Sequence, residues 1–373
     1  MKTISVEKEC TNYETYRAQR VKSLFNAEYG HKFSISVDTD IDEFDWKIGV
    51  VVGASGTGKT SIGKTFFDGQ IYDLKNGWAD DLPIIDAIAP DGDFNSVTSA
   101  LSAVGLGSVP SWLRPFSVLS NGEQFRSGLA RLLLSDEKAV VLDEFTSVID
   151  RQVARIASGA FQKAWRRKEG RQAVILTPHY DILPWLEPDW IIDTNAKNYK
   201  RGCLQRPKFE LEIRQTNGSY WKYFKPHYYL DLPMPIAAQY FVGLVDGEPV
   251  AHVAVCPFFQ SGYYRATRLV VMPEWQGAGI GTRFLNAVCQ WHLDGNGRCG
   301  RKLPVIFHTS HPQLAAALRR SPLWVQKSAV LYQKAGTKFS LAHKDGTSGG
   351  HSWYGGHFRA VQGFAYLGGV RNA

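Results

Sequence analysis

The stretch IGVVVGASGTGKTS at residues 48–61 decides how the first half of this chain is expected to fold. An apolar run rich in β-branched residues predicts a buried strand, and a Gly-x-x-x-x-Gly-Lys-Thr loop follows it at the start of a helix. Glycines let backbone N–H groups close around phosphate oxygens, and the positive end of the helix adds to the attraction. We therefore expect a phosphate site here, with these contacts: Gly53, Ser55, Gly56, Gly58, Lys59, Thr60 and Ser61.

A second apolar strand, AVVLDEF at residues 139–145, ends in two acids. In a nucleotide site of this kind Lys59 would reach the β- and γ-phosphates, and the hydroxyl of Thr60 would sit on Mg²⁺. An acid at the end of a buried strand can hold Mg²⁺ through water, and the acid after it can polarise an attacking water. Asp143 and Glu144 are therefore the candidates for these two tasks.

Length and composition restrict the classes of protein to which the chain can belong. At 373 residues it is long enough for two domains. It has no run of about eighteen apolar residues and no apolar segment at its N-terminus, so we expect neither a membrane span nor a secretory signal. The five cysteines are scattered without a CxxC pair, which favours a reduced, cytoplasmic chain without a zinc site or disulfides.

Charge is divided unequally between the two halves of the chain. Residues 1–195 carry 21 Lys and Arg against 27 Asp and Glu, whereas residues 196–373 carry 22 against 8. The halves therefore have formal net charges of −6 and +14, which together give the +8 of the whole chain. A strongly basic half favours an anionic partner such as CoA or nucleic acid. A solvated basic surface without a partner is the plainer alternative.

The basic half contains a second strand–loop–helix pattern. Residues 239–255 alternate around an Asp-Gly turn and predict a β-hairpin. A strand at residues 269–272 then leads through a glycine-bearing loop into an amphipathic helix. Backbone N–H groups of this loop would point at another phosphate, and the contacts expected are Gln276, Gly277, Gly279, Ile280 and Gly281. An aromatic, basic segment at residues 219–230 would either stack on nucleic-acid bases or pack on its own domain.

Five motifs in a fixed order make the first half resemble the nucleotide-binding domain of the ABC ATPase family. They are GASGTGKT (residues 53–60), LSNGEQ (119–124), VVLDE (140–144), SVID (147–150) and His179. The resemblance implies that Glu144 is the catalytic base and that His179 contacts the γ-phosphate. It also implies that Ser120 and Gly122 complete the ATP site of a second subunit, so we expect a homodimer formed through this domain.

Two departures from the ABC pattern affect this expectation. No glutamine occurs between residues 71 and 123, where the family carries its Q-loop glutamine, and Asp86 is a weak substitute. The segment between the first two motifs is also short. In transporters this region docks on the membrane subunit, so its shortness favours an ABC ATPase that works without a membrane partner.

Residues 205–340 of the second half are similar to the GNAT acyltransferase superfamily, on the strength of the hairpin and of MPEWQGAGIG at residues 272–281. The likeness implies that CoA pyrophosphate sits on residues 276–281. The pantetheine arm of CoA would pair with the strand edge at Leu269 and Val271. The next strand, at residues 304–310, would splay away from the first and open a slot for the thioester.

Acyl transfer from a thioester to an amine needs a base for the amine proton and a donor for the leaving thiolate. Family members often use a tyrosine on the helix after the splayed strand, but here that helix has Arg319 and Arg320 and no tyrosine. His308, His311 and Tyr332 are the substitutes that the sequence offers. A lone histidine is more often structural than catalytic, and that alternative stays open for each histidine.

Together these expectations describe an α/β chain with a P-loop ABC-type ATPase domain at residues 1–200 and a GNAT-like mixed α/β domain at 201–373. The combination resembles proteins of archaea, phages and other mobile DNA in which an ABC-type ATPase is fused to a GNAT-like domain. A fainter likeness connects the second domain with Mom-type phage enzymes, which carbamoylmethylate adenine in DNA.

We therefore expect a cytoplasmic enzyme without a membrane partner that uses ATP, Mg²⁺ and acyl-CoA, with acetyl-CoA favoured. Its favoured acceptor is an amine of nucleic acid, with modification of a DNA base preferred over RNA. The alternatives are an amine of a protein or small molecule, and a GNAT-like sensor domain that regulates the ATPase without transferring anything.

Overall fold

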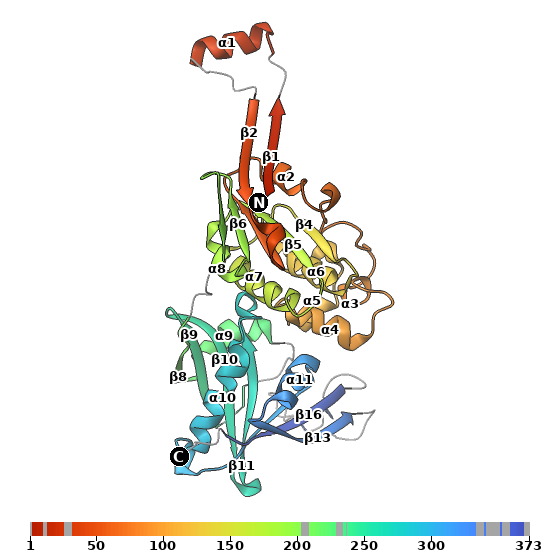
Figure 1. Cartoon of the computed structure of the whole chain (residues 1–373). Helices are drawn as coiled ribbons and strands as arrows, with labels where there is room; N and C mark the ends of the chain where they lie inside the picture. The colour runs from red at the N-terminus through yellow and green to blue at the C-terminus, as the bar shows by residue number, and fades with distance from the viewer. Residues whose placement is uncertain are drawn as a thin grey trace. The chain divides into compact units, whose positions relative to one another are not determined.

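The chain forms two compact units in the computed structural model, Met1–Lys208 and Phe209–Ala373, and each is described by itself (Figure 1). The structure describes residues 2–9, 13–25, 32–202, 209–228, 234–235, 237–332, 339–340, 351–352 and 359–368. Both units mix helices with a main sheet, as predicted. In the described part of the chain, no helix has both the length and the apolar surface needed to cross a bilayer.

The central sheet of the first unit has the strand order β4–β5–β3–β6–β7. The strands are β3 (Ile48–Val52), β4 (Ala139–Leu142), β5 (Gln172–Thr177), β6 (Trp190–Asp193) and β7 (Asn198–Arg201). The first four run parallel and β7 is the antiparallel edge. Every residue of β3 is buried, which explains why it reads as a continuous apolar run. The loops after β3, β4 and β5 consequently emerge at one edge of the sheet.

Apart from α1 (Tyr16–Phe25), the helices of this unit lie around the sheet; α1 lies at the outer end of an N-terminal hairpin, away from the sheet (Figure 1). The other helices are α2 (Lys59–Gly63), α3 (Ile84–Ala87), α4 (Phe94–Ala103), α5 (Val109–Trp112), α6 (Asn121–Leu134), α7 (Arg151–Trp165) and α8 (Leu183–Leu186). The hairpin pairs β1 (Lys2–Glu9) with β2 (Lys32–Thr39). Ile4, Ile35 and Val37 of the hairpin share one buried cluster with Val51 of β3 and Trp190 of β6, and this shared cluster attaches the hairpin to the sheet.

Side-chain caps fix where the two long helices begin. The Ser120 hydroxyl accepts from the Glu123 N–H, and the Glu123 carboxylate accepts from the Ser120 N–H at 2.9 Å, which together form a capping box at α6. The Asp150 carboxylate accepts from the backbone N–H groups of Gln152 and Val153 at the start of α7. Both caps belong to sequence motifs that were assigned to the nucleotide site, so these motifs also determine local structure.

The second unit is built on a seven-stranded sheet with the order β13–β16–β12–β11–β10–β9–β8. The strands are β8 (Glu212–Thr216), β9 (Gln239–Val245), β10 (Glu248–Phe258), β11 (Tyr263–Val271), β12 (Val305–Thr309), β13 (Trp324–Tyr332) and β16 (Arg359–Tyr366); β14 (Phe339–Ser340) and β15 (His351–Ser352) pair separately. Asp246 and Gly247, with φ of 52° and 83°, make the predicted hairpin turn.

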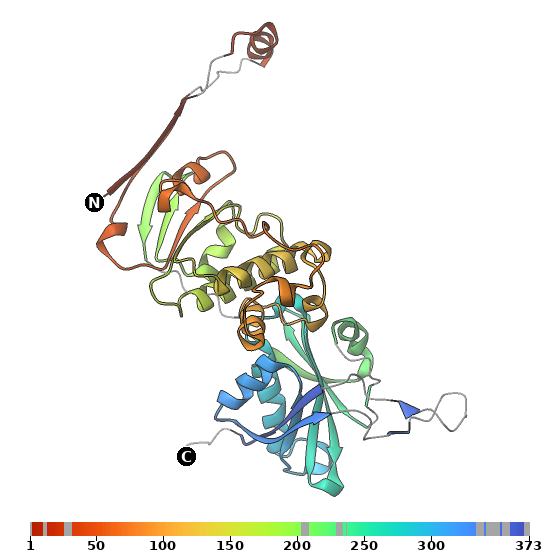
Figure 2. The same cartoon turned by 90° about the vertical axis from the view of Figure 1, so that its right-hand side faces the viewer.

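Helices lie on both faces of this sheet, as Figure 2 shows. Side chains of α10 (Ile280–Leu293) and α11 (Pro312–Arg320) join the large core on one face. On the other face Trp221 and Phe224 of α9 (Trp221–Phe224) are buried against Val242 and Leu244. These two aromatic residues of the segment at 219–230 therefore pack on their own domain, whereas Tyr223 is about half exposed.

Strands β11 and β12 separate soon after they meet. They pair in parallel only from Tyr264 with Val305 to Ala266 with Phe307. Beyond that point β12 continues beside β16, and β11 continues beside β10 through a register shift. Arg268 has a φ of 55°, which marks the bulge on β11. The predicted splay between these two strands is therefore present in the fold.

Candidate active sites

The glycine-rich loop at residues 53–58 joins β3 to α2 in a conformation that glycines make accessible. Gly53, Gly56 and Gly58 have φ of 155°, 79° and 86°. A Cβ on Gly53 would lie 2.0 Å from Thr194 Oγ1, so a side chain has no room there, whereas a Cβ on Gly56 would meet nothing within 4 Å. The loop thus combines tight packing on the sheet with an open side on which phosphate oxygens fit.

Lys59 is buried, with 6% of its side chain exposed, and its Nζ donates to the carbonyl oxygen of Ala54 at 2.8 Å. Its ammonium group is therefore folded back across the loop that it follows. A cation in this place lies where the β- and γ-phosphates are expected. The structure agrees with the binding role predicted for Lys59, and that role remains a prediction.

The expected Mg²⁺ ligands Thr60 and Asp143 are in direct contact, with Thr60 Oγ1 donating to Asp143 Oδ2 at 2.8 Å. A hydroxyl and a carboxylate oxygen are the hard ligands that Mg²⁺ prefers, and Mg²⁺ commonly takes few protein ligands beside water and phosphate. No group of three or more His, Cys, Asp or Glu residues that could hold a metal occurs among the described residues. The Thr60–Asp143 pair has the oxygen ligands expected for Mg²⁺, and its role as a metal site remains a prediction.

Glu144 follows Asp143 at the same edge of the sheet and has a φ of 51°, an uncommon value for a residue with a side chain. Its side chain is exposed, and its Oε2 accepts a hydrogen bond from the Ser147 hydroxyl. The strained backbone and this contact hold the carboxylate outside the sheet. Glu144 is consequently a solvent-accessible carboxylate directly after Asp143, and its role as a base remains a prediction.

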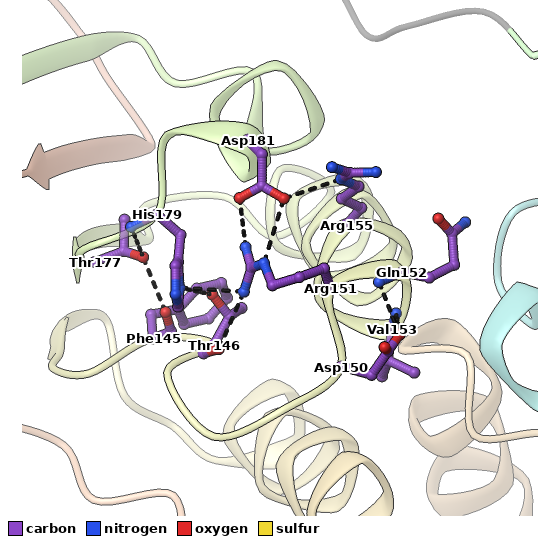
Figure 3. Close-up of polar contacts among 10 residues, drawn as sticks. All are labelled: Phe145, Thr146, Asp150, Arg151, Gln152, Val153, Arg155, Thr177, His179 and Asp181. Carbon is purple, nitrogen blue, oxygen red and sulfur yellow. Dashed lines mark hydrogen bonds and ion pairs between the residues drawn. The ribbon is translucent and has the colours of Figure 1, made fainter.

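His179 lies after β5, where several contacts fix its imidazole ring (Figure 3). The backbone N–H of His179 donates to Thr177 Oγ1 at 3.2 Å. The ring Nδ1 lies 3.3 Å from Thr146 Oγ1 and 3.1 Å from Arg151 Nη1. Burial first, and the Arg151 guanidinium second, lower the pKa of His179 from its ordinary value. His179 is therefore a neutral imidazole near pH 7.

The residues expected to serve a second subunit, Ser120 and Gly122, sit at the start of α6. The Ser120 hydroxyl also donates to Glu123 Oε2 at 2.7 Å, and a Cβ on Gly122 would lie 3.2 Å from Val153 of α7. No hydrogen bond within the described ranges joins either residue to the loop at 53–58. Their role in a second subunit's site stays a prediction.

One acid near the metal position was missed by the sequence interpretation. Ile71 bridges Val141 of β4 in parallel, and the Tyr72 N–H donates to the Val141 carbonyl at 2.8 Å. Asp73 follows this bridge by two residues, just as Asp143 follows Val141, so both acids leave the sheet at the same edge. Asp86, the substitute considered for the absent glutamine, lies exposed on α3. The strand pairing, which no sequence motif shows, makes Asp73 a better candidate than Asp86 for the place of the absent glutamine.

The loop at residues 276–281 leads into α10 in the second unit. Gly277 and Gly279 have φ of 96° and 79°, and a Cβ on Gly279 would meet nothing within 4 Å. The N–H groups of Gln276 and Ala278 are used in turns, donating to Pro273 and Trp275 carbonyls at 3.3 Å. The N–H groups in the first turn of α10 are left without helical partners by helix geometry, and they are the ones that fit a phosphate.

The strand edge predicted for pantetheine runs past this loop. Gln276 Nε2 donates to the Val271 carbonyl at 3.1 Å, and a Cβ on Gly281 would lie 3.2 Å from Val271 Cγ2. Leu269 lies beyond the last pair between β11 and β12. The edge of β11 near Leu269 thus faces the splay, as the prediction requires.

His308 is the first residue of β12 beyond its last pair with β11. Its Nδ1 is buried and has no hydrogen-bond partner within the described part of the chain. Burial, and then the charge of Arg265, lower the pKa of His308, so the ring is neutral near pH 7. Gly363 leaves room for the ring, because a Cβ there would lie 3.0 Å from His308 Nε2. A buried, unpaired ring nitrogen at the splay is compatible with a catalytic task.

The other two substitutes are placed differently. His311 caps α11, because its ring Nδ1 accepts from the Leu314 N–H at 3.3 Å. The backbone N–H of His311 donates to Thr309 Oγ1 at 3.0 Å. These contacts give His311 a structural task and make it a weaker catalytic candidate than His308. Tyr332 ends β13, and its side chain lies outside the described residues.

Comparisons with known proteins match the chain to two different kinds of protein. The family described as Acetyltransferase (GNAT) domain matches residues 237–336. The chain is 32% identical over 165 residues to the inner membrane ABC transporter ATP-binding protein YddA of Escherichia coli, a match that covers 39% of this chain and 28% of YddA. It is 30% identical over 135 residues to the cytochrome c biogenesis ATP-binding export protein CcmA of Nitrosospira multiformis, covering 34% and 63%.

A solved structure, cbiO1 from Clostridium perfringens, part of the ABC transporter complex cbiONQ, is also similar at 17% identity and a TM-score of 0.34, covering 42% of this chain and 76% of that one. The chain spans less than two thirds of the length of the curated relatives it matches. It combines a region similar to ABC ATP-binding proteins with a region that matches the GNAT acetyltransferase domain. The predicted fold class is confirmed in both parts.

Proposed function

We propose that the chain is an ATP-dependent N-acyltransferase that moves an acyl group from acyl-CoA onto an amine of nucleic acid, with a DNA base favoured. The observation that supports the ATPase half most directly is the contact between Thr60 and Asp143 beside the glycine-rich loop. The observation that supports the transferase half is the splay of β11 and β12 next to the open start of α10.

Hydrolysis of ATP needs a base for water and a stabiliser for the γ-phosphate. Glu144 would take the proton of the attacking water, and the neutral imidazole of His179 would donate to the γ-phosphate. Thr60 and Asp143 would hold Mg²⁺, which when bound neutralises charge on the β- and γ-phosphates. Asp73 follows the bridge between Ile71 and Val141 and would assist this pair.

In the transferase unit, acyl-CoA would bind with its pyrophosphate at the start of α10 and its arm along β11. The acceptor amine would attack the thioester carbonyl, so that an N–C bond forms as the C–S bond breaks. We assign the amine proton to the buried Nδ1 of His308, and the resulting imidazolium returns a proton to the CoA thiolate. The lowered pKa of His308 keeps it neutral and able to accept this proton.

Charge supports an anionic acceptor for the second half of the chain. Residues 196–373 carry 22 Lys and Arg against 8 Asp and Glu, so the cations of that half outnumber its acids by 14. Exposed cations such as Lys222, Lys225, Lys302 and Lys327 are available for phosphates. Binding of a polymer through phosphates is expected to weaken steeply with salt, whereas turnover of a small amine is not.

The acceptor is tested on nucleic acid from cells that express the wild-type chain or a Gly279→Glu variant. After digestion to nucleosides, mass spectrometry is expected to find a mass-shifted nucleoside only with the wild type, and its mass names the acyl group. Matching nucleoside profiles would reject nucleic acid as the acceptor and would direct the search to protein or small amines, or to a sensor domain.

We propose that two copies of the chain form a homodimer through the ATPase unit. In a Glu144→Gln chain the base is lost while the phosphate contacts remain, so ATP is expected to stay bound and to hold two subunits together. Light scattering is expected to show dimers of Glu144→Gln only with MgATP. Lys59→Ala is the control and should stay monomeric under the same conditions. A Glu144→Gln chain that remains monomeric at saturating MgATP would contradict the dimer.

A further inference from the structure

Arg151, the first residue of α7, makes several polar contacts around His179, although no sequence motif assigns it a role. Its Nη1 donates to His179 Nδ1 at 3.1 Å and to the Thr146 carbonyl at 3.3 Å. Its Nη2 and Nε donate to the carboxylate of Asp181, and Figure 3 shows the guanidinium between Asp181 and the imidazole. Arg151 directly follows the cap residue Asp150, so it ties the start of α7 to the loop after β5.

Hydrogen-bond chemistry decides the state of the ring that Arg151 contacts. A guanidinium group has N–H donors and no acceptor, and it stays protonated in proteins. His179 Nδ1 must therefore present its lone pair to Arg151, and the Thr146 hydroxyl near the same nitrogen can also donate to it. In a neutral imidazole the single proton is then on Nε2, at the opposite edge of the ring.

We infer that Arg151 is a positioning residue for ATP hydrolysis, which holds the His179 ring with its N–H on Nε2 as the donor to the γ-phosphate. The inference rests on the ATPase function proposed above. In this inference Arg151 acts through its contact with His179 Nδ1. No motif in the sequence assigns this task to the residue that follows Asp150.

Asp181 makes the arrangement rigid. It follows His179 by two residues and accepts from both Arg151 and Arg155, the latter at 3.0 Å from Arg155 Nε. Arg151 and Arg155 lie one turn apart on α7 and so reach the same carboxylate. Thr146, whose carbonyl also accepts from Arg151, is buried and has a φ of 68°. A displacement of the start of α7 would therefore turn the His179 ring.

The chain supplies a matched control for this inference. Arg151→Gln and Arg155→Gln each remove one cation beside Asp181, but only Arg151 contacts His179. Spectra of the full chain labelled with ¹⁵N-histidine, assigned with a His179→Gln variant, report which ring nitrogen carries the proton. The wild type and Arg155→Gln are expected to show the Nε2–H form alone. Arg151→Gln is expected to show a mixture of the two tautomers.

This spectroscopic result does not depend on turnover. An Nδ1–H ring in the wild type, or a single Nε2–H form that persists in Arg151→Gln, would overturn the inference. If the wild type shows the expected tautomer but hydrolyses no ATP, the ATPase proposal fails while the placement of the proton by Arg151 stands. The two failures are thus distinguishable.

Kinetics supply the second readout. Arg151→Gln is expected to lower kcat roughly 10- to 100-fold while KM for ATP stays within about twofold. The reason is that the His179 ring would stabilise the charge on the γ-phosphate in the transition state more than it stabilises bound ATP. Arg155→Gln should keep at least about half of the wild-type kcat. Equal losses in both variants, or a loss in KM alone, would contradict a positioning role.

The pH profile should also change in a defined direction. The groups that act on His179 are Arg151 from α7, Lys59 from α2, Glu144 after β4, and Asp181 on its own loop. Removing the Arg151 charge raises the pKa of His179, so the ring becomes protonated at higher pH. The acid limb of kcat is then expected to move to higher pH in Arg151→Gln and to stay in place in Arg155→Gln. An unmoved limb would count against the inference.

Discussion

Lys59→Ala is expected to hydrolyse ATP at less than about one hundredth of the wild-type rate, because a fixed cation at a transferred phosphate typically contributes two to three orders of magnitude. The Nζ of Lys59 is buried against the loop that it crosses, where no other lysine or arginine contact to the Ala54 carbonyl occurs among the described residues. The measurement is steady-state release of phosphate at saturating MgATP, with acyl transfer followed in parallel.

The control for this variant lies on the same short helix. Lys64 is the exposed C-cap of α2, and Lys64→Ala removes an equal charge without touching the loop. It should hydrolyse ATP within about twofold of the wild type. A Lys59→Ala chain that retains a tenth of the wild-type rate of ATP hydrolysis would show that Lys59 and its loop are not part of the catalytic site. A chain that loses hydrolysis but modifies its acceptor at the wild-type rate would show that transfer is independent of ATP.

Gly279→Glu is expected to weaken binding of acetyl-CoA by about two orders of magnitude or more. A side chain at a φ of 79° is strained, and a carboxylate at the start of α10 would repel the pyrophosphate from the helix terminus. Calorimetric titration with acetyl-CoA measures the change directly and does not require the acceptor to be known.

Gly262→Glu is the matched control for backbone strain. Gly262 has a φ of 72° and open space around it, so it takes the same substitution with a similar conformational cost in a turn before β11. It should bind acetyl-CoA within about threefold of the wild type. Equal losses in the two variants would mean that folding of the unit, rather than repulsion at α10, explains the effect.

The local features of the candidate nucleotide site could be predicted from the sequence, while nucleotide binding by these residues stays a prediction. The glycine-rich loop, the acids after β4 and the capping box at Ser120 each need only neighbouring residues, and the structure forms all three. The motifs also linked Thr60 with Asp143, but the contact between Arg151 and His179 could not be predicted in this way. Arg151 and His179 belong to different motifs, and only the parallel pairing of β4 with β5 brings their loops together.

The second unit shows the same division. The hairpin turn at Asp246 and Gly247 follows from local backbone preferences, and the structure forms it. The choice between His308 and His311 depended on burial and caps, since both residues lie in one short polar segment of the sequence. One turned out to be a buried ring at the splay and the other a helix cap.

Strand β16 sets the order in which the two units can be completed during synthesis. It lies between β12 and β13 although it comes last of the three in the chain, and it pairs with both along most of their length. A nascent chain on the ribosome therefore cannot close the sheet around His308 until β16 has left the exit tunnel. The ATPase unit has no such dependence on later residues and is free to fold first. If the proposed functions hold, each new molecule would thus pass through an interval in which its first unit is folded before its second unit is complete.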